Sequence, residues 1–133
     1  MKLKRQRTKY HSREITRDGM TFDSLKEYRR FRELTLLEKA GSITDLKRQV
    51  EFELIPSHFE EIPTGEFYKR GEKKGMPKMK HVCVEQSVKY VADFTYTENG
   101  KTIVEDTKGF KTKDYILKRK MMLYFHGIKI KEI

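Results

Sequence analysis

Two aspartates and a lysine lie on a predicted β-hairpin, where they can gather around a divalent cation. Asp93 belongs to the run VKYVADFTY, and Asp106 and Lys108 belong to KTIVEDTK. Asn99-Gly100 lies between these runs, and this dipeptide between strand-forming segments is a strong hairpin signal. Because side chains alternate along a strand, Asp106 and Lys108 share a face and can meet Asp93. Converging carboxylates suit Mg²⁺ or Mn²⁺, and the lysine can orient a water or neutralise phosphate charge.

Glu27 is a further candidate, at the start of a helix predicted over residues 24–40. It precedes Phe31 and Leu34 by four and seven positions, so it shares their apolar stripe and can face the sheet. Ser24 and Glu27 also fit a capping box, in which the glutamate accepts a hydrogen bond from the backbone N–H of Ser24. The sequence leaves both roles open, just as it leaves open a hairpin whose three charges are merely solvated.

The wider pattern predicts a small α+β domain over residues 10–133, preceded by a flexible basic arm over residues 1–9. Alternating apolar residues predict strands, and apolar residues at helical spacing predict helices. The expected elements are a helix over 24–40, a strand over 46–55, strands over 81–96 and 101–108, a helix over 112–126, and a closing strand over 127–133. The second helix is expected to be buried on more than one side.

Residues 57–80 interrupt this pattern. Pro56 and Pro63 disfavour a central strand, and glycine and lysine are abundant between residues 63 and 80. Such a composition is typical of segments without a fixed structure, so a mobile basic loop is predicted over 57–80. The loop can contact a DNA backbone or be an inert surface, and the sequence alone does not decide between them.

Composition restricts the function classes. The chain has 133 residues and a formal net charge of +10, which indicates attraction to a polyanion such as nucleic acid. Cys83 is the single cysteine, so neither an internal disulfide nor a cysteine-based zinc cluster can form. No apolar run is long enough for a membrane span and no secretory signal is visible, so a cytosolic location without membrane partners is expected.

The hairpin motif resembles that of the PD-(D/E)XK nuclease superfamily, with Asp93 as the first acid and residues 106–108 as the D-x-K. Ala92 stands where this family usually has proline. The chain is similar to small phage and prophage endonucleases of the Holliday-junction-resolvase type over residues 22–55 and 88–133. It resembles the end-cleaving subunit of heteromeric transposases more distantly. The resemblance implies a restriction-endonuclease-like α-β-β-β-α-β core around a central mixed sheet.

The resemblance also implies a metal-dependent DNA endonuclease that uses Mg²⁺ or Mn²⁺. The implied catalytic residues are Glu27, Asp93, Asp106 and Lys108. The implied metal ligands are Asp93, Asp106, Glu27 and the Thr107 carbonyl. The charge pattern adds candidate DNA-binding residues, which are Lys69, Arg70, Lys73, Lys74, Lys78, Lys80, Lys111, Lys113, Lys118 and Arg119.

The expected substrate is branched DNA. A resolvase cuts two opposed strands, so a homodimer is expected, and a phage origin would place it in the cytoplasm of a bacterial host cell. Two other functions remain open: a non-catalytic basic DNA-binding protein with a nuclease fold, and a transposon-end or restriction-like endonuclease.

Overall fold

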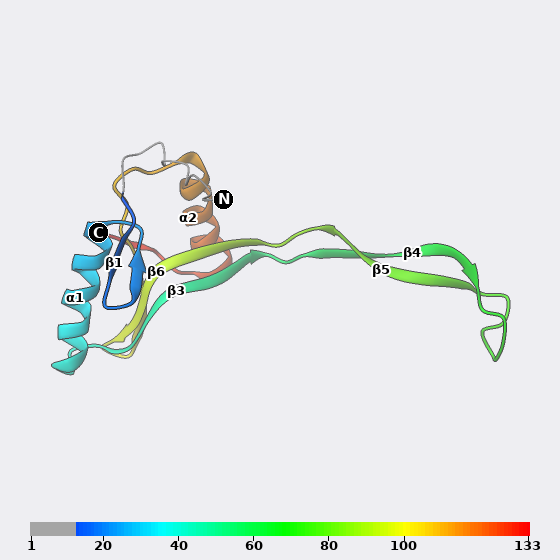
Figure 1. Ribbon diagram of the computed structural model, residues 1–133, viewed down its shortest axis with the longest axis horizontal. Coiled ribbons are helices and arrows are strands. Elements are labelled where there is room, and N and C mark those ends of the chain that lie inside the picture. Colours follow the sequence, from blue (N-terminus) through cyan, green and yellow to red (C-terminus); the bar gives the residue numbers. More distant parts are fainter. Residues whose placement is uncertain (1–12) are drawn as a thin grey trace. The chain divides into compact units, whose positions relative to one another are not determined.

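The computed structural model describes residues 13–133, so the predicted basic arm over residues 1–9 lies outside the described part. The chain divides into two compact units. The first contains the described residues up to Phe52 together with Val91–Ile133, and the second is Glu53–Tyr90. The elements, labelled in Figure 1 where space allows, are β1 (Ile15–Arg17), β2 (Met20–Phe22), α1 (Leu25–Lys39), β3 (Thr44–Ile55), β4 (His58–Phe67), β5 (Pro77–Glu85), β6 (Val88–Glu98), β7 (Lys101–Asp106), α2 (Lys113–His126) and β8 (Lys131–Glu132).

A four-stranded mixed sheet is the centre of the first unit. Its strand order is β3-β6-β7-β8, in which β6 pairs antiparallel with β7 and β8 pairs parallel with β7. A parallel neighbour requires a crossover connection, and α2 provides it between β7 and β8. The order α1, β3, β6, β7, α2, β8 is the predicted one, and the α+β fold class with a mixed sheet is confirmed.

The predicted hairpin between β6 and β7 is confirmed. Glu98 pairs with Lys101, so a two-residue turn joins the strands. Asn99 and Gly100 have φ angles of 49° and 74°. Positive φ at both turn positions is what a type I′ hairpin turn requires, and Asn-Gly adopts it at low cost. The turn therefore fixes the register that brings Phe94 opposite Glu105.

Both faces of the sheet are covered. Residues 92–96 of β6 are all buried, although their side chains alternate between the two faces. Glu105 contacts Arg30 of α1, whereas Lys108, which pairs with Asp106, lies against Tyr115 of α2. Because Glu105 and Asp106 are consecutive on β7, the two helices lie on opposite faces, as can be followed in Figure 1. On the α1 side the core consists of Leu34, Ile43, Phe94 and Tyr96, with Phe31, Leu46 and Ile103 packed against it.

The helix boundaries follow local signals. Ser24 caps the start of α1, and Gly41, at φ 80°, follows its end. Thr112 caps α2 by accepting a hydrogen bond from the Tyr115 N–H at 3.1 Å, and Gly127 ends this helix at φ 66°. These boundaries agree with the sequence, because caps and left-handed glycines act within a few residues. Neither helix in the described range is long and apolar enough to cross a membrane.

Two expectations at the C-terminal end were wrong. Helix α2 fully buries only Tyr115 and Met122, and four of its large apolar side chains are more than half exposed: Leu117, Leu123, Tyr124 and Phe125. The closing strand predicted over 127–133 is reduced to the two residues of β8, although Ile130 before it is buried. Apolar content alone therefore overstated how much of this end is covered.

The loop predicted over 57–80 is instead a two-stranded antiparallel ribbon. Strands β4 and β5 pair from His58 opposite Glu85 to Phe67 opposite Pro77. Nearly all ribbon residues are exposed on both faces, so the segment lacks the alternation of buried residues that would have signalled strands. Pro63 is tolerated because each strand of an isolated ribbon has an unpaired edge where no N–H is needed.

Candidate active site

The first turn of α1 carries Glu27 into the interior. The Ser24 hydroxyl accepts a hydrogen bond from the Glu27 N–H at 3.1 Å, which fixes the helix start. Glu27 lies on the same stripe as Leu34, and the two residues are 1% and 0% exposed. The predicted inward orientation of Glu27 is therefore confirmed, and its carboxyl group is carried into the interior of the first unit.

The Glu27 carboxylate bonds to the backbone before α1 through one oxygen and faces β3 with the other. Its Oε2 accepts a hydrogen bond from the Asp23 N–H at 2.9 Å, which is one residue before the N–H expected for a capping box. Its Oε1 accepts a hydrogen bond from Gln49 Nε2 at 3.0 Å and lies 3.9 Å from Arg48 Nη2. One oxygen therefore caps the helix backbone, while the other faces the side chains of β3.

Arg48 and Gln49 are consecutive on β3, so regular alternation would send them to opposite faces. Gln49 has a φ of 51°, which interrupts that alternation. Arg48 is held in place by the Thr21 carbonyl at 2.8 Å and by the Phe22 ring, whose centroid is 3.9 Å from its guanidinium carbon. The local distortion lets both β3 side chains approach Glu27.

Three carboxylates meet at this point. Asp23, Glu27 and Asp93 each offer an oxygen, and these atoms all lie within 4.8 Å of one another. Carboxylate oxygens are the ligands that Mg²⁺, Mn²⁺ and Ca²⁺ prefer. Asp23 was missed from the sequence, where it is one polar residue before a helix. Its position four residues before Glu27 is the only signal that pointed to it.

Electrostatics at the cluster favour a cation. Burial, and next the negative charge of Asp93, raise the pKa of the Glu27 carboxyl to about 7. The hydrogen bond from the Asp23 backbone opposes this shift, as does the charge of Arg48. A divalent cation would relieve the repulsion between the carboxylates and restore the charged form of Glu27. The donor set and its charge therefore fit a hard divalent metal ion.

Asp93 connects the hairpin strands at the end of β7. Its Oδ2 accepts hydrogen bonds from the backbone N–H and the hydroxyl of Thr107, both at 2.8 Å. The pairing of Phe94 with Glu105, continued by one residue, brings Asp93 opposite Asp106. Directly opposed residues would share a face, but Asp93 bonds to Thr107 and joins Asp23 and Glu27 rather than Asp106, so the common face of Asp93 and Asp106 stays a prediction.

Asp106, at the end of β7, and Lys108, two residues later, form an ion pair. Lys108 Nζ lies 3.3 Å from Asp106 Oδ1, and the Asp106 residue is fully buried. The same ammonium group lies 4.8 Å from the centroid of the Tyr115 ring. Burial, and next the negative charge of Asp106, raise the pKa of the Tyr115 hydroxyl. The sequence predicted that Asp106 would join Glu27 and Asp93 as a metal ligand. Among the described residues, the third member of that carboxylate group is instead Asp23, and Asp106 is paired with Lys108.

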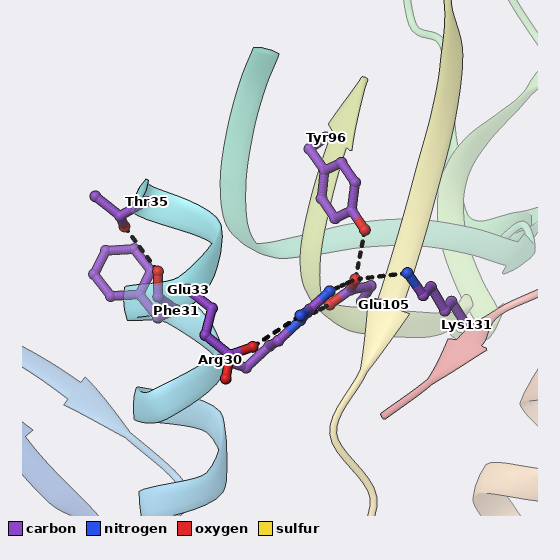
Figure 2. A network of polar contacts seen from close by, with 7 residues as sticks. All are labelled: Arg30, Phe31, Glu33, Thr35, Tyr96, Glu105 and Lys131. Atoms are coloured by element: carbon purple, nitrogen blue, oxygen red, sulfur yellow. Dashed lines mark hydrogen bonds and ion pairs between the residues drawn. The ribbon is translucent and has the colours of Figure 1, made fainter. Parts of the chain in front are cut away.

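A buried ionic network joins α1, which carries Glu27, to β7, which carries Asp106 (Figure 2). Arg30 donates to Glu105 through Nε at 2.8 Å and through Nη2 at 2.5 Å, and Tyr96 donates its hydroxyl to Glu105 at 2.5 Å. Lys131 of β8 lies 3.7 Å from the same carboxylate. Burial alone raises the pKa of Glu105, but the Arg30 and Tyr96 hydrogen bonds reverse this and hold the pKa below its usual value.

This network has a geometric consequence for the site. Arg30 lies one helical turn after Glu27, and Glu105 immediately precedes Asp106. The bidentate pair therefore fixes the helix that carries one candidate residue against the strand that carries the other. The sequence did not indicate this role, because no local pattern relates Arg30 to Glu105.

The predicted DNA-binding residues fall into two groups. Six lie in the second unit, near the end of the ribbon: Lys69, Arg70, Lys73, Lys74, Lys78 and Lys80. The other four lie at or just before α2. Of these, Lys111 and Arg119 pair with Glu132 at 2.6 and 2.9 Å, and Lys118 pairs with Asp114 at 3.5 Å. Lys113 is exposed at the first position of α2.

Comparison with known proteins places the chain in a family without assigning it an activity. No curated protein and no solved structure shows significant similarity to it. Residues 7–132, nearly the whole chain, match the family described as "Protein of unknown function (DUF1064)". The chain therefore belongs to the DUF1064 family.

Proposed function

We propose that this protein is a metal-dependent DNA endonuclease that uses Mg²⁺ or Mn²⁺. The observation that carries the proposal is the meeting of the Asp23, Glu27 and Asp93 carboxylates beside the Asp106–Lys108 pair. This group lies at the open end of the β6–β7 hairpin, away from the Asn99-Gly100 turn. The hydrogen bonds from Thr107 to Asp93 link these two groups directly. Acids and a lysine brought together from α1, β6 and β7 suit hydrolysis of a phosphodiester.

The cation would be held by the Glu27 and Asp93 carboxylates, with Asp23, Asp106 and the Thr107 carbonyl as further donors. When bound, a divalent ion in such a site polarises a phosphate oxygen and lowers the pKa of a coordinated water. Lys108 neutralises part of the charge of Asp106 and presents N–H donors to a non-bridging phosphate oxygen. Glu27 would serve in its charged form as one of the ligands, because the cation would offset the burial and repulsion that raise its pKa in the metal-free protein.

DNA is the substrate that the charge favours, because a net charge of +10 attracts a polyanion. Within DNA substrates we propose branched molecules, on the resemblance to resolvase-type endonucleases. Cleavage of two opposed strands at a branch calls for two active sites, so the proposed active form is a homodimer. Light scattering that finds only monomer, with and without junction DNA, would instead favour an enzyme that nicks one strand.

The test is a substrate panel with matched variants. Four-way junction, flap, linear duplex and single-stranded DNA are each incubated with Mg²⁺ or with EDTA. We expect Mg²⁺-dependent cleavage that is greatest on the branched molecules, and its loss in Asp93→Asn, Asp106→Asn and Lys108→Ala with DNA binding retained. Asp114→Asn, whose side chain is 77% exposed on α2, is the matched control and should cleave normally.

Three results would redirect the assignment. If the three variants cleave at the wild-type rate, the proposed active site is wrong. If the wild-type protein binds the panel but cleaves none of it, the non-catalytic DNA-binding alternative is favoured. Cleavage of linear duplex in preference to branches would favour a restriction-like or transposon-end endonuclease.

A further inference from the structure

The closed end of the β4–β5 ribbon is an ordered turn over residues 68–76 (Figure 1). The Tyr68 N–H donates to the Met76 carbonyl at 2.9 Å, and the Gly75 N–H donates to the Tyr68 carbonyl at 2.9 Å. Inside the turn, the Met76 N–H donates to the Lys73 carbonyl at 2.9 Å. These backbone bonds give the side chains of the ribbon end defined positions on the surface.

Charge is separated along the ribbon. Residues 68–80 contain six lysines and arginines and a single acid, Glu72. Of the other acids of the unit, Glu53, Glu60, Glu61 and Glu85 lie away from this end, whereas Glu66 adjoins it next to Phe67. A solubilising surface would mix the two signs, whereas this arrangement concentrates positive charge at the closed end. The ribbon end is therefore suited to a phosphate backbone.

Large apolar side chains are exposed at the same end. Phe67, Tyr68 and Met76 are 57%, 37% and 54% exposed. The ammonium groups of Lys73 and Lys78 lie 5.7 and 5.5 Å from the centroid of the Tyr68 ring. Exposed aromatic rings among cations are the combination with which proteins stack bases and hold the adjoining phosphates.

From these observations we propose that the ribbon end is a second DNA contact, which recognises bases that are unpaired or unstacked. Phe67 and Tyr68 stack on the exposed bases, and the six surrounding cations contact the backbone. An intact duplex hides its base faces, whereas a branch point or a single strand exposes them. This contact rests on the proposed function for its ligand, and it adds a reason for the preference for branched DNA that the acidic site does not supply.

Binding measured by fluorescence anisotropy in EDTA tests the contact without cleavage. The probes are a single strand, the linear duplex of the same sequence and a four-way junction. Changing both rings, Phe67→Ala with Tyr68→Ala, should weaken binding of the single strand and junction by about 5- to 100-fold, with less than about a 2-fold change for duplex. The dependence on salt should stay the same, since no cation is removed.

Two further variants separate stacking from charge. Phe59→Ala is the matched control, because Phe59 is 45% exposed on the same ribbon but stacks on His81 with centroids 4.5 Å apart. It should bind all three probes normally. Lys73→Ala with Lys74→Ala should weaken all three probes alike and reduce the salt dependence. Circular dichroism would show whether each variant is folded.

Cross-linking provides a test that needs no variant. Single-stranded DNA carrying 5-iododeoxyuridine is irradiated with the wild-type protein, and we expect the linked peptide to contain Phe67 or Tyr68. The contact would be overturned if the double-ring variant bound every probe as tightly as the wild-type protein does. It would also be overturned if the cross-linked peptides contained neither Phe67 nor Tyr68. A double-ring variant that loses dimerisation while keeping its DNA affinity would overturn it too, because the ribbon end would then be a subunit interface.

The outcome is separable from that of the proposed function. Wild-type protein that cleaves junctions, together with a double-ring variant that binds them normally, would refute the ribbon contact alone. Wild-type protein that binds single strands through the two rings but never cleaves would refute the nuclease alone.

Discussion

Replacing Glu27 by glutamine should stabilise the protein at alkaline pH when no divalent cation is present. The folded state raises the pKa of Glu27 from 4.5 to about 7. Above pH 7 the folded chain therefore holds a charged carboxylate that it disfavours, whereas below pH 4.5 both states are protonated and no cost exists. At 1.36 kcal/mol per pKa unit, the cost at pH 8 is on the order of 3 kcal/mol.

Glutamine removes this charge but keeps most of the contacts. Its amide oxygen can still accept the hydrogen bond from the Asp23 N–H, while its NH₂ group can donate to Gln49 if that amide reverses. The lost acceptor costs about 1 kcal/mol. The expected net gain for Glu27→Gln is about 1–2 kcal/mol in the free energy of unfolding at pH 8.

Urea unfolding of both proteins at pH 8 and at pH 4.5, in EDTA, measures this difference. The gain should be present at pH 8 and absent at pH 4.5. Glu33→Gln is the control, because this glutamate is on the same helix with a side chain that is 63% exposed, and it should change stability by less than about 1 kcal/mol at either pH. If Glu27→Gln is no more stable than wild type at pH 8, or gains equally at both pH values, the electrostatic reasoning is wrong.

Mg²⁺ provides the complementary measurement. A ligand that binds only the folded state stabilises it by about 2.7 kcal/mol at one hundred times its Kd. Saturating Mg²⁺ at pH 8 should therefore stabilise the wild-type protein and have a much smaller effect on Glu27→Gln. Equal stabilisation of both would place the ion elsewhere.

Two further predictions concern the contact between α1 and β7 and the end of α2. Arg30→Ala leaves the buried Glu105 carboxylate with only Tyr96 and the more distant Lys131, so it should lower the free energy of unfolding by about 3 kcal/mol in urea titrations. Arg30→Met combined with Glu105→Leu removes both charges and should lose much less stability, and equal losses would contradict the role of an uncompensated charge. Gly127→Ala should lower the free energy of unfolding by about 1 kcal/mol in thermal unfolding, because a φ of 66° strains an alanine, although its Cβ would meet no atom within 4 Å. A neutral result would show that the end of α2 readjusts.

The parts of the fold that the sequence predicted depend on short-range chemistry. Asn99-Gly100 sets the hairpin, and the caps at Ser24 and Thr112 set the helix starts. Each signal acts through bonds within a few residues, so it can be recognised without knowing the tertiary structure. The orientation of Glu27 was predictable for the same reason, since helical periodicity relates it to Leu34.

The parts that the sequence did not predict depend on distant partners or on solvent. Arg30 and Glu105 are 75 positions apart, and no local pattern relates them. Asp23 joins Asp93 only because β2, α1 and β6 come together. The ribbon escaped detection for a different reason: its strands are exposed on both faces, so hydrogen bonding rather than burial organises them, and a composition rich in lysine and glycine resembles that of a disordered segment.

The two buried glutamates respond to acidity in opposite senses. Hydrogen bonds keep the pKa of Glu105 low, so its contribution to stability is present above pH 4.5 and is lost in acid. Glu27 has a raised pKa, so stability declines as the pH rises towards 7. Taken together, these two groups favour the folded, metal-free protein at pH values between acid and neutral. A tightly held divalent ion would extend the upper limit of that range, so its depletion should be felt first in alkaline solution.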